Sequence, residues 1–408
     1  MSQFDPYSAE FLADPYPTYA RLRRESPVFH DAAWDLTFVA RHRDIDSILK
    51  DRQRFGRDFR HRLAVGEVDQ GLYQRIFPPQ WPTWTSYVRD SFIDLEPPRH
   101  TRLRRLVSQA FTRRSSESFR PRLEEEADRI LDRALETGSL EVISEFATPI
   151  PVRMIADLMG IPEADRPLLL EWSHAIVRVF DERVTSEEGD EAETATRDFV
   201  AYLEERLAER RESPGEDLIS AMIEVEEQGE ALTDFEIVAT SILTLNAGHE
   251  ATVHAIGNAL LTLARNPDAY RQLGQGGVDV SRAAEELLRY DSPLQMFERW
   301  VLEDVELDGQ TVPAGSKVGL LFGSANRDEE IFDEADHLDL DRSPNPHLAF
   351  GAGVHHCVGA PLARVELEAA LSRFARRVGE IDLVSATGRI ESLVFRGMGR
   401  IELAIAAV

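Results

Sequence analysis

The hydrophobic pattern of this chain is mostly helical, and two segments show it best. One follows Cys357, where apolar residues at helical spacing predict a buried helix: Leu362, Val365, Leu367, Ala369, Leu371 and Phe374. The other begins at a capping box, Thr-Asp-Phe-Glu at 233–236, and ends at Asn266-Pro267. At 1.5 Å per residue, this second helix spans roughly 50 Å, enough to cross a whole domain.

Weaker patterns occupy much of the remaining chain. Shorter helices are predicted over 16–22 and 44–51, and several amphipathic helices over 121–231, joined near Pro162 and at the acidic stretch 187–193. Alternation predicts a strand over 34–40 and a hairpin over 305–321, which turns at Asp308-Gly309 and again at 313–315. These patterns predict a mainly α protein with small β-sheets.

Residues 56–92 interrupt the regular pattern, because three prolines and many aromatic residues fall there. A structureless stretch of this length is usually functional or disordered, and the aromatic rings argue against disorder. The rings either pack on the core or line a binding pocket. The aromatic residues are Phe59, Tyr73, Phe77, Trp81, Trp84, Tyr87 and Phe92.

Composition narrows the classes of protein that remain. The chain is 43% hydrophobic, and no linker, repeat or low-complexity tract divides it, so we expect one large domain over 1–408. A single cysteine allows no intrachain disulfide and is typical of a reducing cytoplasm. The polar first thirty residues favour a soluble protein without a membrane anchor. A net charge of −27 argues against nucleic acid as a partner.

The only cysteine stands in a glycine-rich loop directly before a predicted helix. Residues 350–359 read Phe-Gly-Ala-Gly-Val-His-His-Cys-Val-Gly, followed by Leu-Ala-Arg at 362–364. A cysteine there lies at the positive end of the helix dipole, which favours the thiolate, and the glycines let a flat group approach the backbone. An inert buried cysteine is one alternative, and a zinc site at 355–357 is another, although three adjacent ligands lack the usual spacing.

This stretch resembles the haem-binding signature of the cytochrome P-450 superfamily. The resemblance implies the P-450 fold, a single mainly α domain that encloses haem b, with Cys357 as the axial ligand of the iron. It also implies haem contacts at Phe350, Gly351, His355 and Gly359. A thiolate ligand of this kind favours cleavage of the O–O bond.

Further haem contacts follow from the same resemblance. His100 and Arg104, four residues apart after Pro97-Pro98, resemble a helix that binds a haem propionate, and Arg299 and His355 resemble two more propionate donors. Without the resemblance, the first pair would be a solvated helix face. The neighbouring arginines 102, 105, 113 and 114 form a basic cluster on an acidic protein, which we expect to bind an acidic ferredoxin.

The middle of the long helix reads Ala247-Gly248-His249-Glu250-Ala251-Thr252 and resembles the segment that passes over the haem iron. The family's acid and threonine there relay protons to bound oxygen. Glu250 matches the acid, but Ala251 stands where the threonine belongs. Thr252 lies about 100° further round the helix, so it does not simply replace that hydroxyl.

Other matches concern support and substrate. Glu286-x-x-Arg289 is either a surface ion pair or, by resemblance, a buried structural pair that supports the cysteine loop. The pocket residues implied by the resemblance are Trp84, Tyr87, Ile176, Val177, Phe180, Leu243, Leu294, Met296, Val394 and Phe395.

The expected function is a cytoplasmic, monomeric monooxygenase. It would insert one oxygen atom of O2 into a small hydrophobic substrate, with electrons that come from NAD(P)H through a separate ferredoxin and ferredoxin reductase. No fused reductase is recognisable in the sequence. Ala251 keeps a second possibility open, a thiolate-haem enzyme of oxidative coupling, dehydration or peroxide-driven chemistry. The third alternative is a haem-based ligand sensor without turnover.

Overall fold

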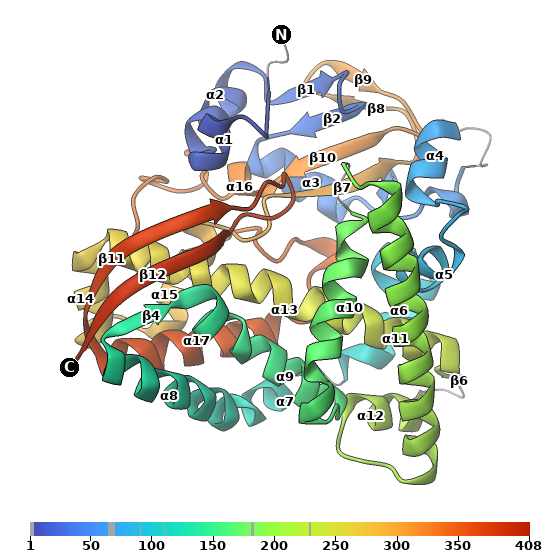
Figure 1. The fold of residues 1–408 in the computed structure, drawn as a ribbon. Coiled ribbons are helices and arrows are strands. Elements are labelled where there is room, and N and C mark those ends of the chain that lie inside the picture. Colours follow the sequence, from blue (N-terminus) through green and yellow to red (C-terminus); the bar gives the residue numbers. More distant parts are fainter. Residues whose placement is uncertain (1–3, 64–69, 90, 110, 181–182, 228–229) are drawn as a thin grey trace. The chain divides into compact units, whose positions relative to one another are not determined.

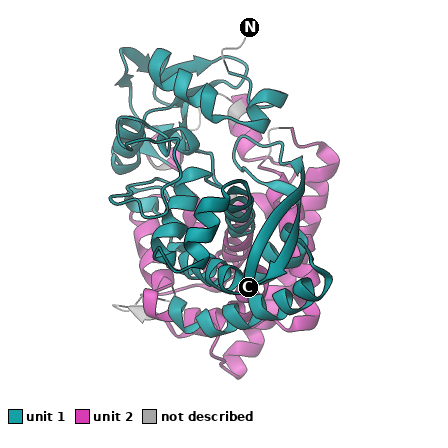
Figure 2. Cartoon of the chain, turned by 90° about the vertical axis from the view of Figure 1, so that its left-hand side faces the viewer, with its two compact units in different colours: residues 1–56, 116–150, 251–408 teal, residues 57–115, 151–250 magenta. Residues whose placement is uncertain are grey.

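The computed structural model describes residues 4–63, 70–89, 91–109, 111–180, 183–227 and 230–408. They fall into two compact units, which Figure 2 colours separately. Unit 1 comprises residues 1–56, 116–150 and 251–408, and unit 2 comprises residues 57–115 and 151–250. No helix in the described part of the chain is both long and apolar enough to cross a membrane.

Unit 1 contains the larger sheet. Its five described strands follow the order β1 (Val28–Asp31), β2 (Leu36–Val39), β10 (Lys317–Leu321), β7 (Met296–Val301) and β3 (Phe55–Gly56). β10 is parallel to β2 and antiparallel to β7. Around this sheet the chain forms helices α1 (Ala9–Ala13), α2 (Tyr16–Glu25), α3 (His42–Lys50) and α16 (Phe322–Ala325).

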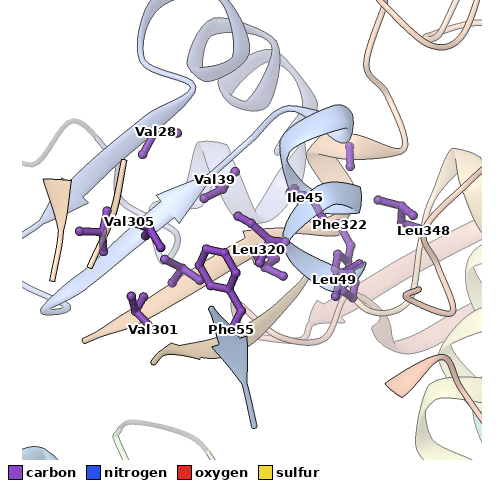
Figure 3. Packing of buried hydrophobic residues seen from close by; sticks show 14 residues of the cluster. Val28, Val39, Ile45, Leu49, Phe55, Val301, Val305, Leu320, Phe322 and Leu348 are labelled. Atoms are coloured by element: carbon purple, nitrogen blue, oxygen red, sulfur yellow. The ribbon is translucent and has the colours of Figure 1, made fainter. Parts of the chain in front are cut away.

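A hydrophobic core packs between this sheet and α3. Figure 3 shows its members, among them Val39, Ile45, Leu49 and Phe322. Leu348, which lies just before the glycine-rich cysteine loop, belongs to the same cluster and is 4% exposed. The core of the sheet therefore anchors the start of that loop.

The remaining helices of unit 1 lie in its middle and C-terminal segments. They are α8 (Arg120–Thr137), α14 (Pro267–Gly274), α15 (Val280–Tyr290) and α17 (Ala360–Arg377). β11 (Val378–Arg389) and β12 (Met398–Ala407) form a long antiparallel hairpin, drawn in red in Figure 1, and β4 (Ser139–Glu141) pairs with β12. β8 (Val305–Leu307) and β9 (Gln310–Val312) form a short hairpin.

Unit 2 is built mainly of helices. They are α4 (Gln70–Ile76), α5 (Pro82–Trp84), α6 (Arg99–Ser108), α10 (Arg166–Arg178), α11 (Ser186–Glu212) and α12 (Leu218–Glu224), with the short strands β5 (Glu226–Glu227) and β6 (Glu230–Ala231). α7 (Arg113–Ser118), α9 (Pro149–Met159) and α13 (Asp234–Arg265) begin in one unit and end in the other.

The long predicted helix is confirmed in α13. Thr233 N donates to the Glu236 carboxylate at 2.9 Å and Glu236 N donates to Thr233 Oγ1 at 3.3 Å, so the capping box is formed. The helix ends at Arg265, one residue before Asn266-Pro267. The predicted turn at Asp308-Gly309 is also confirmed, and both residues have positive φ angles of 48° and 74°.

Three local predictions are wrong. The acidic stretch 187–193 is not a joint but the first two turns of α11, because the Thr185–Glu188 capping box starts the helix just before it. Residues 70–76 form α4, in a segment predicted to be irregular. The hairpin over 305–321 stops at Val312, because β10 instead pairs with β2 and β7.

Candidate functional site

The cysteine loop of unit 1 is held by its own backbone. Cys357 N donates to Phe350 O at 2.9 Å, and Gly351 N donates to Leu348 O at 2.9 Å. Gly353 has a φ of +69°, and a Cβ on it would lie 2.1 Å from Leu49 O, so only glycine fits where the loop crosses the end of α3. Cys357 is exposed and stands three residues before α17.

Side chains of α15 and α17 also hold this loop in place, through hydrogen bonds and a ring contact. Arg364 donates to both Glu285 oxygens at 2.7 and 2.9 Å, and its guanidinium lies 4.4 Å from the centre of the Phe350 ring. His347 Nδ1 accepts from Ala349 N at 3.2 Å, so Nε2 carries the proton and donates to Glu285 at 3.2 Å. Burial alone would raise the pKa of Glu285, but the hydrogen bonds from His347 and Arg364 lower it to about 2.

Sequence reasoning missed Glu285 and His347. Glu285 directly precedes Glu286, and the local sequence does not indicate which of these two adjacent acids pairs with which arginine. The partners lie 62 and 79 residues away in the chain.

Glu286 and Arg289 form a fully buried ion pair, with Nε to Oε2 at 2.7 Å and both side chains 0% exposed. The surface-pair alternative is therefore wrong. Arg342 adds a second cation, with its Nε 3.1 Å from Glu286 Oε2. Arg289 also donates to the carbonyl oxygens of Asn326 and Ala335 at 2.9 and 2.8 Å. Asn326 Oδ1 in turn accepts from Leu348 N at 2.6 Å, so this network reaches the start of the cysteine loop.

Four of the expected pocket residues meet in unit 1. Leu294 and Phe395 form an isolated antiparallel bridge, and Gln295 N donates to Val394 O at 2.8 Å. Met296 is 4% exposed, whereas Leu294, Val394 and Phe395 are partly exposed. The turn at 393–398 therefore lies beside the start of β7.

A second group of expected pocket residues meets in unit 2. Trp84 Nε1 donates to Ile176 O at 3.1 Å, and the Trp84 ring lies 5.5 Å from the Phe180 ring. Trp84 and Ile176 are both 0% exposed, while Phe180 is 41% exposed and lies just beyond the end of α10. Val177 is partly buried. Trp84 thus fixes the end of α10 with its only polar atom.

The other two candidates of unit 2 lie near α13. The Tyr87 ring is 4.7 Å from that of Phe235, and burial together with the charge of Glu204 raises the pKa of Tyr87. Leu243 is partly buried on α13 itself. The role of all these residues in substrate contact stays a prediction.

The middle of α13 divides at Glu250 and Ala251 between the two units. In unit 2, Ala247 is exposed, and a Cβ on Gly248 would lie 2.6 Å from Ile155 Cδ1, so the glycine lets α13 pack closely on α9. Burial raises the pKa of Glu250, whose Oε2 has no hydrogen-bond partner among the described groups.

In unit 1, Thr252 faces an acid that sequence reasoning did not find. Its Oγ1 lies 3.5 Å from Oε2 of Glu366 on α17. Glu366 is 1% exposed, and this burial raises its pKa to about 8 despite the hydrogen bond from Thr252. The two residues are 114 positions apart, so no local signal pointed to the pair.

Of the four expected propionate donors, two lie in unit 2 and two lie in unit 1. His100 is 1% exposed on α6, where Arg104 lies one turn further on. Arg299 is 5% exposed on β7, and His355 is partly buried in the cysteine loop. Their role as propionate donors stays a prediction.

Comparison with known proteins identifies the group to which this chain is related. The model of the family described as Cytochrome P450 matches residues 83–276 and 280–377. The chain belongs to the cytochrome P450 family. It is 35% identical to the biotin biosynthesis cytochrome P450 of Bacillus subtilis, over 95% of this chain and 94% of that protein. It is also 35% identical to the vitamin D(3) 25-hydroxylase of Pseudonocardia autotrophica, over 98% of this chain and 95% of that one.

The fold agrees with this assignment. The structure of P450BioI in complex with an acyl carrier protein ligated to hexadec-9Z-enoic acid has a TM-score of 0.89 and 32% identity, over 97% of this chain and 99% of that one. The expected P450 fold, mainly α with small β-sheets, is therefore confirmed. The chain is an oxidoreductase of the monooxygenase class, and its family uses haem iron and O2.

The residues present fit a haem. Cys357 offers an exposed thiol, and the Cβ position of Gly351 has no atom within 4 Å, so a flat group can lie against this side of the loop. The nearest atom to the Cβ position of Gly359 is Cys357 Sγ itself, at 3.9 Å. The zinc alternative at 355–357 is wrong, because the described part of the chain has no group of three or more His, Cys, Asp or Glu suited to a metal ion.

Proposed function

We propose that this P450 inserts one oxygen atom of O2 into a small hydrophobic organic substrate, with electrons delivered from NAD(P)H by a separate ferredoxin and ferredoxin reductase. The observation that carries the proposal is the exposed Cys357 thiol, held in a clamped glycine-rich loop before α17. A thiolate ligand to haem b is the chemistry that such a loop supports.

The chain's own residues would hold haem b in defined ways. Cys357 would ligate the iron, with Phe350, Gly351 and Gly359 beside it. His100, Arg104, Arg299 and His355 would donate charge-assisted hydrogen bonds to the propionates. Ala247, which is exposed on α13, would leave room for the ring, and Gly248 beside it would let α13 lie close to α9. Bound haem supplies the activation of O2, and the protein supplies binding, orientation and protons.

One acid directly precedes Ala251 in the chain, and a second contacts Thr252, the residue after it. The buried carboxyl of Glu366, with a pKa of about 8, is mostly protonated at pH 7 and lies next to the Thr252 hydroxyl. Glu250 is the second acid, one residue before Ala251. We assign proton delivery to these two acids, with Thr252 acting through its hydrogen bond to Glu366 and not in the place of a hydroxyl at 251.

The two groups of pocket residues support an apolar substrate. Leu294, Met296, Val394 and Phe395 are hydrophobic, and the only polar atom of Trp84 is engaged by Ile176 O. The fatty acyl group in the P450BioI complex and the vitamin D(3) named for the Pseudonocardia relative are both largely apolar compounds. We therefore place the substrate in the lipid-like or terpenoid size range, either free or attached to a carrier.

The proposal includes the arrangement of the enzyme in the cell. Residues 1–408 act as a single haem domain, as a monomer in the cytoplasm. Sedimentation equilibrium of the purified holoprotein tests the oligomeric part, since a monomer has a chain mass of 46.1 kDa.

Ala251 favours one second function, which is peroxide-driven, coupling or dehydration chemistry on the same haem. Hydrogen peroxide already carries the two electrons and two protons that O2 would have to receive, so chemistry driven by peroxide depends less on the hydroxyl that is absent at residue 251. Turnover with hydrogen peroxide in the absence of any redox partner would support this alternative.

Two measurements test the main proposal. An optical titration of the ferric holoprotein with a panel of fatty acids, sterols, terpenoids and macrolides should give a low-spin to high-spin shift with at least one of them. With that compound, ferredoxin and reductase should give NADH consumption together with an oxygenated product. NADH consumption that yields only hydrogen peroxide and water would contradict the proposal.

A further inference from the structure

Unit 2 carries a row of buried polar atoms on α13 that lack partners. Asn246 Oδ1, His249 Nε2 and Glu250 Oε2 are each buried and make no hydrogen bond to any described group. Asn246 is three residues before His249 and four before Glu250, so it neighbours both on the helix surface. Buried polar groups of this kind usually bind internal water, which makes about three hydrogen bonds to them.

The state of His249 follows from its geometry. Its Nδ1 lies 2.9 Å from Leu245 O, and a carbonyl can only accept, so Nδ1 carries the proton. In the neutral ring, Nε2 therefore presents a lone pair. The residue is 2% exposed, and burial lowers its pKa, as does the charge of His174, so the ring is neutral at pH 7. His249 is thus a buried base.

An exposed histidine, His174, neighbours this buried base. It lies on α10, and its ring centre is 6.1 Å from that of His249. Unlike His249, it is exposed. Its pKa is lowered by burial of part of the ring and by the charge of Arg178, which itself pairs with Glu188 and Glu191 at 3.7 and 3.5 Å.

We propose that His174, His249 and Asn246 form a water-mediated proton inlet that ends at Glu250. The inference rests on the proposed monooxygenase function, to which it adds the route from solvent. A proton that enters beside His174 is taken up at His249 Nε2. The same nitrogen then releases it through water held by Asn246, and the carboxylate of Glu250 accepts it. His249 returns to the neutral ring, Glu250 gains one proton, and no electron is transferred.

The first test is independent of turnover. A high-resolution crystal structure of the holoprotein should show an ordered water within hydrogen-bond distance of both His249 Nε2 and Asn246 Oδ1. In the Asn246→Leu variant that water should be lost. A partner side chain on His249 Nε2, a metal ion between the two histidines, or no solvent there would each overturn the inlet.

The second test measures proton delivery. His249→Gln keeps a hydrogen-bonding side chain that cannot be protonated at neutral pH. We expect the fraction of NADH electrons recovered in product to fall roughly ten-fold, with a larger solvent isotope effect on turnover. Asn246→Leu should show the same two changes. The matched control is His30→Gln, at an exposed histidine of β1, which should leave both quantities unchanged.

The outcomes separate this inference from the proposed function. If the wild-type enzyme forms product but His249→Gln has the same coupling and isotope effect, the inlet is refuted and the monooxygenase function stands. If the wild type forms no product although the water is present, the function fails, and the water site stands without a role in proton delivery to turnover. The haem absorption spectrum of each variant shows whether it has folded.

Discussion

Thr252 Oγ1 lies 3.5 Å from Glu366 Oε2, and both side chains are buried. Glu366 belongs to the helix that begins just after Cys357, and Thr252 follows the alanine that replaces the family's usual threonine. The pair therefore places a hydroxyl beside a buried acid, one residue after Ala251. In the proposed function, this pair would supply protons without a hydroxyl at residue 251.

Replacement of Glu366 by glutamine should make the free energy of unfolding less dependent on pH. The pKa of Glu366 rises from 4.5 to about 8 on folding, so between these values the folded state binds more protons than the unfolded state. The free energy of unfolding then decreases as the pH rises through this window, by at most about 1.4 kcal/mol per pH unit. Urea unfolding at pH 5 and pH 8 should show a smaller loss in Glu366→Gln than in the wild type.

The matched control for that measurement is Glu380→Gln, at an exposed glutamate of β11. It should lose as much stability between pH 5 and pH 8 as the wild type does. An equal loss in Glu366→Gln would show that Glu366 does not keep its proton in the folded state.

Removal of the Thr252 hydroxyl should uncouple turnover. Thr252→Val keeps the shape of the side chain but leaves the Glu366 carboxyl without its hydroxyl partner. Loss of a positioned proton-transfer group lowers the rate of the step that it serves by a factor of roughly a hundred or more. We expect more hydrogen peroxide and less product per NADH. Thr262→Val, at a second buried threonine of α13, is the control and should couple as the wild type does.

The sequence correctly predicted the elements that are determined by residues close together in the chain. The capping box at Thr233, the two-residue turn at Asp308-Gly309 and the glycine-flanked cysteine are each fixed by residues within a few positions of one another. The acidic stretch misled for the same reason. Its glutamates predict a joint between helices, whereas Thr185 caps a helix that contains them, with Glu187 and Glu188 in the first turn of α11, where acids are favourable.

Long-range contacts explain what the sequence did not predict. Glu366 is one of many glutamates in helical patterns, and only the folded chain brings it to Thr252. α4 forms within a proline-rich and aromatic-rich segment, where the rings of Tyr73 and Phe77 pack on Phe59 at 6.2 and 6.4 Å. Such tertiary packing outweighs local propensity, which alone gave no helix there.

The Glu286–Arg289 pair should tolerate little change. Arg289→Lys loses the bidentate hydrogen bonds to Glu286 and the hydrogen bonds to the carbonyl oxygens of Asn326 and Ala335. Because a buried charge is then left incompletely paired, we expect a loss of roughly 3–5 kcal/mol in the free energy of unfolding. Chemical denaturation of the holoprotein, followed by haem absorbance, measures it.

An exposed pair with the same spacing provides the control. Arg271 and Asp268 are also three residues apart on one helix, but their side chains are 65% and 93% exposed. Arg271→Lys should change the stability by less than about 1 kcal/mol. Similar small losses in both variants would contradict the structural role of Arg289.

The indole N–H of Trp84 should stabilise the end of α10. Trp84→Phe keeps an aromatic ring beside Phe180 but leaves Ile176 O without this donor, which costs roughly 1–3 kcal/mol for a buried group. We expect a lower unfolding temperature and weaker binding of the compound that gives the spin shift. Trp34→Phe, at a tryptophan stacked on Tyr7, should leave ligand binding unchanged. Unaltered binding in Trp84→Phe would separate Trp84 from the substrate pocket.

The basic cluster of 102, 105, 113 and 114 should govern electron delivery. The chain carries a net charge of −27, so a basic surface is needed to attract an acidic ferredoxin. A change at Arg102 would also break its ion pair with Glu236 at 2.8 Å, so the test uses Arg105 and Arg113. The double variant Arg105→Glu, Arg113→Glu should slow reduction by ferredoxin roughly ten-fold at low salt and weaken its salt dependence. Stopped-flow reduction at several ionic strengths measures both effects, with Arg400→Glu on β12 as the control for a charge reversal elsewhere on the chain. Equal rates and equal salt dependence in the double variant and the wild type would place the ferredoxin on another surface.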